Sequence, residues 1–77
     1  MKEFKVMLDG NIDTVKSFCH ICEQFDFDLD IRSGKYTVDS KSILGVLSLK
    51  FSEPLSLSVN DDKYNTAVEG LKEFIVK

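Results

Sequence analysis

The sequence predicts an α+β protein in which one antiparallel sheet is covered by helices on a single face. Four stretches alternate between apolar and polar residues, so each forms a strand with one apolar side. The stretches between them change to helical spacing, which gives the order β-α-β-β-α-β-α. A chain of 77 residues has room for one domain, 1–77, that buries about three-fifths of its unfolded surface. One layer of helices over one layer of strands is the simplest way to cover those apolar faces.

The first strand and the first helix follow one another within residues 3–25. The strand places Phe4, Val6 and Leu8 on one face. Residues 9–11 have turn composition, and either Asn11 or Asp13 is expected to cap the next helix. The apolar stripe of that helix is made of Val15, Phe18, Cys19, Cys22 and Phe25.

A hairpin is expected between residues 27 and 38. Its first strand has an apolar face and a charged face, and a tight turn at Ser33-Gly34 leads into the second strand, because glycine supplies the positive φ that such turns need. The apolar residues of the two strands are Phe27, Leu29 and Ile31 in the first and Tyr36 and Val38 in the second.

The central helix begins after Ser42, whose hydroxyl can accept a bond from a free backbone N–H of the first turn. Its apolar positions, 43, 44, 46, 47 and 49, surround most of the helix. Two turns on a small domain cannot bury all of them, so either Leu44 and Leu47 or Val46 and Leu49 should face water. An exposed apolar patch of this kind indicates a docking surface. Gly45 lowers helix stability by roughly 1 kcal/mol relative to alanine, which suggests a close contact at the missing side chain.

The last strand and the last helix complete the pattern. Pro54 is acceptable at a strand start, and the strand turns Leu55, Leu57 and Val59 to one face. Residues 60–62 open the final helix with acids near its positive end. The buried stripe of this helix is expected to contain Tyr64, Ala67, Val68, Leu71 and Ile75, with Phe74 beside it.

Composition excludes several functional classes. The chain is 43% hydrophobic and 30% charged, with a net charge of −3, which argues against binding nucleic acid or an anionic membrane. No apolar run approaches the ~20 residues of a membrane span, and the N-terminal segment does not resemble a signal peptide. We therefore expect a cytoplasmic protein.

The segment Lys41-Ser42-Ile43-Leu44-Gly45-Val46-Leu47-Ser48-Leu49 closely resembles the regulatory-serine segment of the HPr family, the histidine-containing phosphocarriers of the bacterial sugar phosphotransferase system. A weaker resemblance extends over nearly the whole chain. It implies an HPr-like open-faced sandwich with strand order 1-4-2-3 and three helices on one face. It also implies that Val46 and Leu49 are buried, that Leu44 and Leu47 are largely exposed, and that Ile43 lies at the rim.

The phosphoryl-accepting site of that family has no counterpart here. In HPr a histidine, closely followed by an arginine and a proline, begins the first helix, where backbone N–H groups receive the phosphoryl group. Alignment without gaps places Asn11 at the histidine position, with Asp13 and Thr14 replacing the arginine and the proline; a shift of two places Asp13 there. Neither alignment recovers an imidazole, and an aspartate would repel an incoming phosphate.

Two further groups could carry chemistry. His20 points away from the apolar stripe in mid-helix, so we interpret it as a surface residue; the alternatives are a phosphoryl carrier and a metal ligand. Cys19 and Cys22 have the spacing C-x-x-C, but they lie on the buried stripe, so we interpret them as reduced core residues and not as a redox pair. No second cysteine pair completes a zinc site, and Asp26, Asp28 and Asp30 lack the spacing of a calcium loop. No metal or cofactor is expected.

Three functional hypotheses follow. The first is a module that is not an enzyme and not a phosphocarrier, and that binds protein partners through Ile43, Leu44 and Leu47. It would resemble the catabolite-repression paralogue of HPr, which also lacks the histidine and keeps the serine. In the family the serine matching Ser42 is phosphorylated by a dedicated kinase, so the implied partners are phosphotransferase-system components, a serine kinase or a transcription regulator. The second is a phosphocarrier with a non-standard site, and the third is an unrelated interaction domain on the same fold. We expect a monomer.

Overall fold

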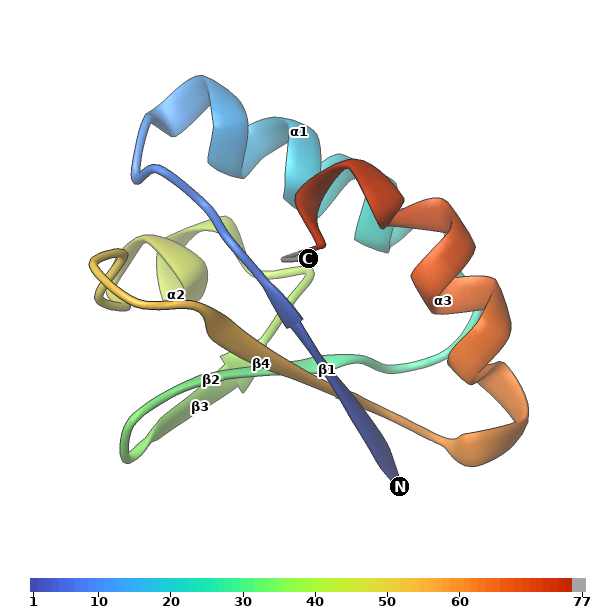
Figure 1. Cartoon of the computed structure of the whole chain (residues 1–77). Helices are drawn as coiled ribbons and strands as arrows, with labels where there is room; N and C mark the ends of the chain where they lie inside the picture. The colour runs from blue at the N-terminus through green and yellow to red at the C-terminus, as the bar shows by residue number, and fades with distance from the viewer. Residues whose placement is uncertain (76–77) are drawn as a thin grey trace.

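The computed structural model describes residues 1–75 and has the predicted order of elements (Figure 1). The strands are β1 (Lys2–Val6), β2 (Asp30–Ser33), β3 (Tyr36–Asp39) and β4 (Leu55–Val59). The helices are α1 (Ile12–Glu23), α2 (Ile43–Leu47) and α3 (Tyr64–Gly70), with short 3-10 turns at Asp61–Lys63 and Lys72–Phe74.

The four strands form one antiparallel sheet in the order β1-β4-β2-β3, which confirms the order that the family resemblance implies. The pairing places Phe4 opposite Leu57, Leu57 opposite Ile31, and Ile31 opposite Val38. One apolar row therefore crosses all four strands on the same face. Helices α1 and α3 lie over this face, and α2 lies near one end of the sheet (Figure 1).

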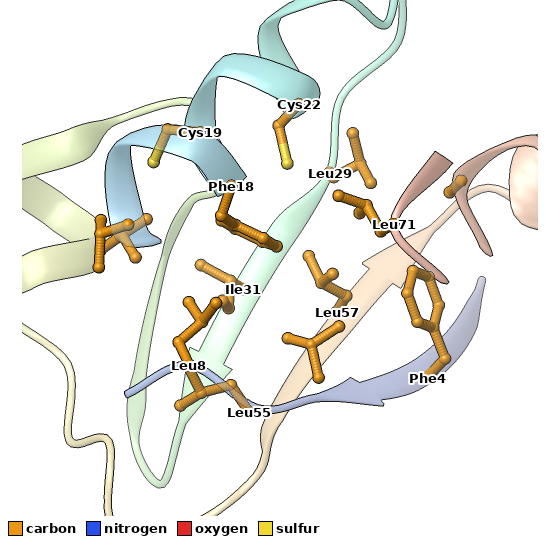
Figure 2. Packing of buried hydrophobic residues seen from close by; sticks show 14 of the residues in the cluster. Phe4, Leu8, Phe18, Cys19, Cys22, Leu29, Ile31, Leu55, Leu57 and Leu71 are labelled. Atoms are coloured by element: carbon orange, nitrogen blue, oxygen red, sulfur yellow. The ribbon is translucent and has the colours of Figure 1, made fainter. Parts of the chain in front are cut away.

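The core fills the space between the sheet and the helices (Figure 2). Phe18 of α1, Leu71 after α3, and Ile31 and Leu57 of the sheet are all fully buried. Each such side chain contributes about 1.5–3 kcal/mol through removal from water. The residues predicted to face inward along the first and last strands are buried as well, although Leu8 lies just beyond the end of β1: Phe4, Val6, Leu8, Leu55, Leu57 and Val59.

The start of β2 differs from the prediction. The strand begins at Asp30, so Phe27 precedes it and is only half-buried. Its ring stacks on that of Phe25, with 4.9 Å between the ring centroids. Leu29 is buried although it also precedes the strand. Alternation in the sequence therefore assigned the correct side to Leu29, and Phe27 packs against the edge of the core from the loop between α1 and β2.

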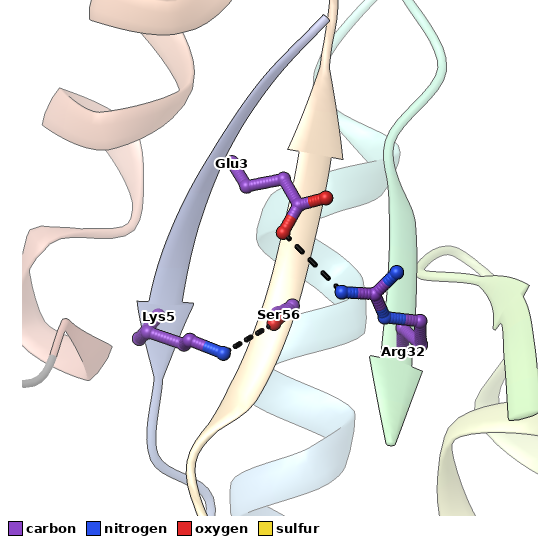
Figure 3. A network of polar contacts seen from close by, with 4 residues as sticks. All are labelled: Glu3, Lys5, Arg32 and Ser56. Atoms are coloured by element: carbon purple, nitrogen blue, oxygen red, sulfur yellow. Dashed lines mark hydrogen bonds and ion pairs between the residues drawn. The ribbon is translucent and has the colours of Figure 1, made fainter. Parts of the chain in front are cut away.

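The opposite face of the sheet is polar, as the alternation predicts (Figure 3). Lys5 donates a hydrogen bond from Nζ to Ser56 Oγ at 2.6 Å, and Arg32 pairs with Glu3 at 3.4 Å. Ser56 is only 4% exposed. The Arg32–Glu3 pair is half-exposed, so its contribution to stability is small.

The turn of the β-hairpin lies one residue later than expected. Ser33 is still paired with Tyr36, so the two-residue turn consists of Gly34 and Lys35. Gly34 has φ of +59°, which is the conformation that made a glycine necessary there.

The last helix is shorter than its apolar stripe suggests. It ends at Gly70, and after a 3-10 turn Ile75 is extended and pairs with Val6 beside β1. A Cβ atom on Gly70 would come within 2.6 Å of the Phe25 ring, so α3 approaches the end of α1 very closely here. In residues 1–75, the helices are all too short or too polar to cross a lipid bilayer.

Candidate functional site

At the N-terminus of α1, two side chains of the chain itself accept hydrogen bonds from backbone N–H groups. Asn11 is the N-cap: its side-chain oxygen accepts a hydrogen bond from the backbone N–H of Asp13 at 2.8 Å. The Asp9 carboxylate in turn accepts a bond from the backbone N–H of Asn11 at 3.0 Å. Of the two caps that the sequence allows, the structure therefore selects Asn11, and Asp13 lies in the first turn.

This arrangement is poorly suited to an incoming phosphate. The Asn11 amide occupies one of the backbone N–H groups that would bind the anion, and an amide nitrogen is not a phosphoryl acceptor. Asp9 and Asp13 add two exposed carboxylates where a phosphoryl group would arrive. Like charges a few ångströms apart repel even in water, by about 1 kcal/mol at 4 Å.

His20 lies in the last turn of α1 and is exposed, as expected for a surface residue. Together with Lys16, Ser17 and Glu23 of the same helix, and Ile43 of α2, it lines a shallow hollow of about 450 Å³. Within residues 1–75, no group of three metal-ligating side chains is present. The hollow brings α1 and α2 together on one surface.

The two cysteines belong to the core. Cys19 and Cys22 are free thiols and fully buried (Figure 2). Burial raises the pKa of Cys19 to about 11 and the pKa of Cys22 to about 12, although a hydrogen bond with Ser40 acts in the opposite direction on Cys22. Both thiols are therefore protonated at neutral pH and lack the thiolate that redox chemistry requires.

Ser40 was not singled out by the sequence. It is fully buried, and its hydroxyl donates to the backbone carbonyl oxygen of Leu29 at 2.9 Å. Nearby, Lys41 Nζ donates to the carbonyl oxygen of Phe25 at 3.0 Å. These two bonds attach the segment before α2 to the loop between α1 and β2.

Ser42 caps α2 as predicted. Its hydroxyl accepts a hydrogen bond from the backbone N–H of Gly45 at 3.3 Å, and the residue is exposed. The close contact expected at Gly45 is also present, because a Cβ atom there would lie 3.2 Å from Val38 Cβ and from Ser42 Oγ. The helix therefore lies directly against β3.

The apolar residues of α2 divide between the core and the surface. Val46 is fully buried and Leu49 is 5% exposed, whereas Leu44 is 82% exposed. Ile43 is half-buried at the rim, in agreement with the expectation. The expectation for Leu47 is wrong: it is half-buried and packs against the core. It is adjacent to Val46, about 100° around the helix, so its side chain flanks the buried face.

The structure adds one apolar residue to this surface that the sequence did not reveal. Ile12, in the first turn of α1, is 53% exposed. It lies one turn before Lys16, on the same side of α1, and Lys16 lines the hollow with Ile43. We call the surface formed by Ile12, Ile43 and Leu44 the α1–α2 surface. The exposure of Ile12 could have been predicted from the sequence, because this residue directly follows the cap and does not belong to the apolar stripe of the helix.

A family model described as the PTS HPr component phosphorylation site matches residues 13–77. The chain belongs to the HPr family. The match begins two residues after Asn11, so the N-cap of α1 precedes the matched segment. Membership in the HPr family also excludes the hypothesis of an unrelated interaction domain. A search of curated protein sequences found no match.

Solved structures agree with this assignment. HPr-C-His from Thermoanaerobacter tengcongensis is 25% identical, with a TM-score of 0.77 over 97% of this chain and 91% of that chain. The phosphocarrier protein HPr from Bacillus anthracis is 22% identical, with a TM-score of 0.72 over 97% and 94%. Crh, the catabolite repression containing protein of Bacillus subtilis, is 20% identical, with a TM-score of 0.64 over 95% and 88%. The last two likenesses concern the fold alone.

Proposed function

We propose that this HPr-family chain is a cytoplasmic, partner-binding module that does not itself carry a phosphoryl group. The observation that carries the proposal is the N-terminus of α1, where the Asn11 amide and the carboxylates of Asp9 and Asp13 stand in place of an imidazole. Its partners are proteins: phosphotransferase-system components, a serine kinase or a transcription regulator. It binds no nucleic acid and catalyses no reaction of its own.

The α1–α2 surface supports binding to partners. Leu44 is the most exposed large apolar side chain in residues 1–75; its neighbour Ile43, half-buried, and the exposed Ile12 of α1 add apolar area. Burying a leucine in an interface contributes about 1.5–3 kcal/mol, so Leu44 is the residue whose loss should weaken docking most. Leu47 is half-buried, so only the exposed part of its side chain is available for contact with a partner.

Titration of the protein with the purified first enzyme of the phosphotransferase system tests this surface by calorimetry. Leu44→Asp should abolish binding, whereas Tyr36→Asp, which removes another large exposed side chain from a different part of the molecule, should leave it intact. Equal loss in the two variants would show that the effect is not specific to the α1–α2 surface. Equal binding by Leu44→Asp and the natural protein would remove α2 from the interface.

Ser42 is the proposed site of regulation by phosphorylation. It is exposed, and a phosphate at the start of a helix is tolerated because the helix dipole favours negative charge there. Incubation with ATP and a kinase that modifies HPr on serine should add phosphate to the natural protein and to Ser48→Ala, but not to Ser42→Ala. Ser48 is the matched control because it is also exposed and lies at the other end of α2. Phosphate on Ser42→Ala would contradict the assignment.

A second candidate function is phosphoryl transfer through His20. It rests on the exposure of His20 beside Lys16 in the hollow between α1 and α2. His20 is far from the free N–H groups of α1, so it lacks the backbone donors that would hold the phosphate. A phosphoryl group that appears with phosphoenolpyruvate and the first enzyme, and is lost in His20→Ala, would establish this alternative.

We also propose that the protein is a monomer. The Crh structure is described as a domain-swapped, intertwined dimer, so the mass in solution must be measured directly. Light scattering should give the mass of one chain, 8.7 kDa, and twice that mass would contradict the proposal.

A further inference from the structure

A second hollow, of about 620 Å³, lies between the turn of the β-hairpin and the segment that follows α2. Its volume is within the range of small-molecule sites, about 300–1,000 Å³. The residues that line it are Ser33, Gly34, Lys35 and Tyr36 from the hairpin, and Ser48, Lys50, Ser52 and Glu53 from the other segment. It shares no lining residue with the α1–α2 surface.

The path of the chain explains why polar residues gather there. Leu49 is buried in the core, and Phe51 packs against Gly10, where a Cβ atom would lie 3.0 Å from its ring. The residues between and beside these two anchors, Lys50 and Ser52, are therefore turned outward toward the hairpin. Because buried and exposed residues alternate along this irregular segment, Lys50 and Ser52 both line the same side of the hollow.

The lysines of this hollow differ from most cations in the chain. Most lysine and arginine side chains in residues 1–75 contact a hydroxyl, a carboxylate, a backbone carbonyl oxygen or an aromatic ring. Within that part of the chain the exceptions are Lys16, Lys35 and Lys50. Two of these three, Lys35 of the hairpin and Lys50 of the segment after α2, line the same hollow in a protein whose net charge is −3.

We propose that this hollow binds the phosphate group of a small phosphate monoester. Lys35 supplies positive charge from the hairpin and Lys50 from the segment after α2, so an anion in the hollow interacts favourably with both. The hydroxyls of Ser33, Ser52 and Tyr36 supply donors at the same hollow. The Ser48 hydroxyl already donates to the Gly45 carbonyl oxygen at 2.6 Å, so it is not one of these donors.

Glu53 provides a second test of the proposal, because it also lines the hollow and carries a negative charge. It weakens the attraction for an anion, so its removal should strengthen binding. A hollow that attracted cations or neutral sugars would show the opposite response or none. The sign of the Glu53→Gln effect therefore distinguishes a phosphate site from a site of another kind.

The test is a titration of the ¹⁵N-labelled full chain with inorganic phosphate and with a hexose 6-phosphate, with the free hexose as the control ligand. Both phosphates should shift the backbone amide signals of residues 33–36 and 48–53, and the free hexose should not. Lys35→Ala and Lys50→Ala should each weaken binding about tenfold, as expected for the loss of one charge-assisted contact. Lys16→Ala, which removes the unpaired lysine outside the hollow, should bind normally, and Glu53→Gln should bind more tightly.

Several results would overturn the proposal. These are the absence of shifts with both phosphates at millimolar concentration, shifts at the N-terminus of α1 instead, or equal weakening by Lys16→Ala. Binding of the free hexose at the hollow would also overturn it. The substituted residues are all exposed, so the dispersion of each spectrum confirms that the variant is folded.

Discussion

Truncation of three apolar residues of α2 to alanine should give three clearly different losses of stability. Val46 is fully buried, so Val46→Ala removes two methyl groups from the core. At about 0.8 kcal/mol per buried carbon, plus the cavity that remains, the free energy of unfolding should fall by about 2–3 kcal/mol. Leu44 is 82% exposed, so Leu44→Ala should change the free energy of unfolding by no more than about 0.5 kcal/mol. The loss of unfolding free energy for Leu47→Ala should lie between these two values, at about 1 kcal/mol, because Leu47 is half-buried.

Urea unfolding followed by circular dichroism measures these differences. A domain of this size is stable by roughly 4–12 kcal/mol, so even Val46→Ala should remain folded in buffer. With a slope near 1 kcal/mol per molar urea, its midpoint should move down by about 2–3 M, while the midpoint of Leu44→Ala stays within about 0.5 M of the natural protein. Equal losses from Leu44→Ala and Val46→Ala would mean that Leu44 belongs to the core. The α1–α2 surface would then have no physical basis.

Three further predictions concern other parts of the molecule. The pKa values of Cys19 and Cys22 are raised in the fold from about 9 to about 11 and 12, so the stability that the two protonated thiols contribute is complete below pH 9 and is lost as the pH rises toward those values. The free energy of unfolding of the double variant Cys19→Ala/Cys22→Ala, measured from pH 8 to 10.5, should therefore fall less than that of the natural protein. Parallel curves of stability against pH would contradict the burial of the two thiols. Gly70→Ala should lower the free energy of unfolding by about 1 kcal/mol, because the clash of the new Cβ atom with the Phe25 ring at 2.6 Å costs more than the gain in helix propensity. If urea unfolding showed the variant to be more stable than the natural protein, the Phe25 ring would have to move aside freely. Asn11→Ala should lose about 1 kcal/mol with the cap, which lowers the melting temperature by about 4–8 °C, and an unchanged melting temperature would mean that the hydrogen bond to Asp13 contributes nothing.

The sequence was most informative where burial has a simple period. Alternation identified the inward faces of β1 and β4 completely, because one face of each strand packs on the core. The strand order was not contained in those patterns. It depended on the resemblance of residues 41–49 to HPr, since nothing in strand periodicity says which strands pair.

The errors arose where local pattern competed with tertiary contacts. The stripe of the last helix continues through Ile75, but the helix ends at Gly70, at the close approach to Phe25. Leu47 was placed on the exposed side, yet on a helix of five residues a flanking side chain still reaches the core. The hollow between Lys35 and Lys50 depends on the path of an irregular segment, which no periodicity describes.

The chemical interpretations depended on where each residue lies on its element. Cys19, Cys22 and His20 are neighbours in sequence, and a helical wheel alone separated the two buried thiols from the exposed imidazole. The choice between Asn11 and Asp13 as the cap could not be made in this way. It required the side-chain hydrogen bond at 2.8 Å that the structure shows.

The central claim, that this HPr-family protein carries no phosphoryl group, is tested most directly by intact-mass spectrometry. The protein is incubated with phosphoenolpyruvate and the first enzyme of the phosphotransferase system, and it is analysed without acid because phosphohistidine is labile in acid. A working HPr in the same mixture confirms that the enzyme is active. We expect the HPr control to gain one phosphoryl group and this protein to keep its original mass. A gain of one phosphoryl group by this protein, at a rate comparable to that of the control, would contradict the claim.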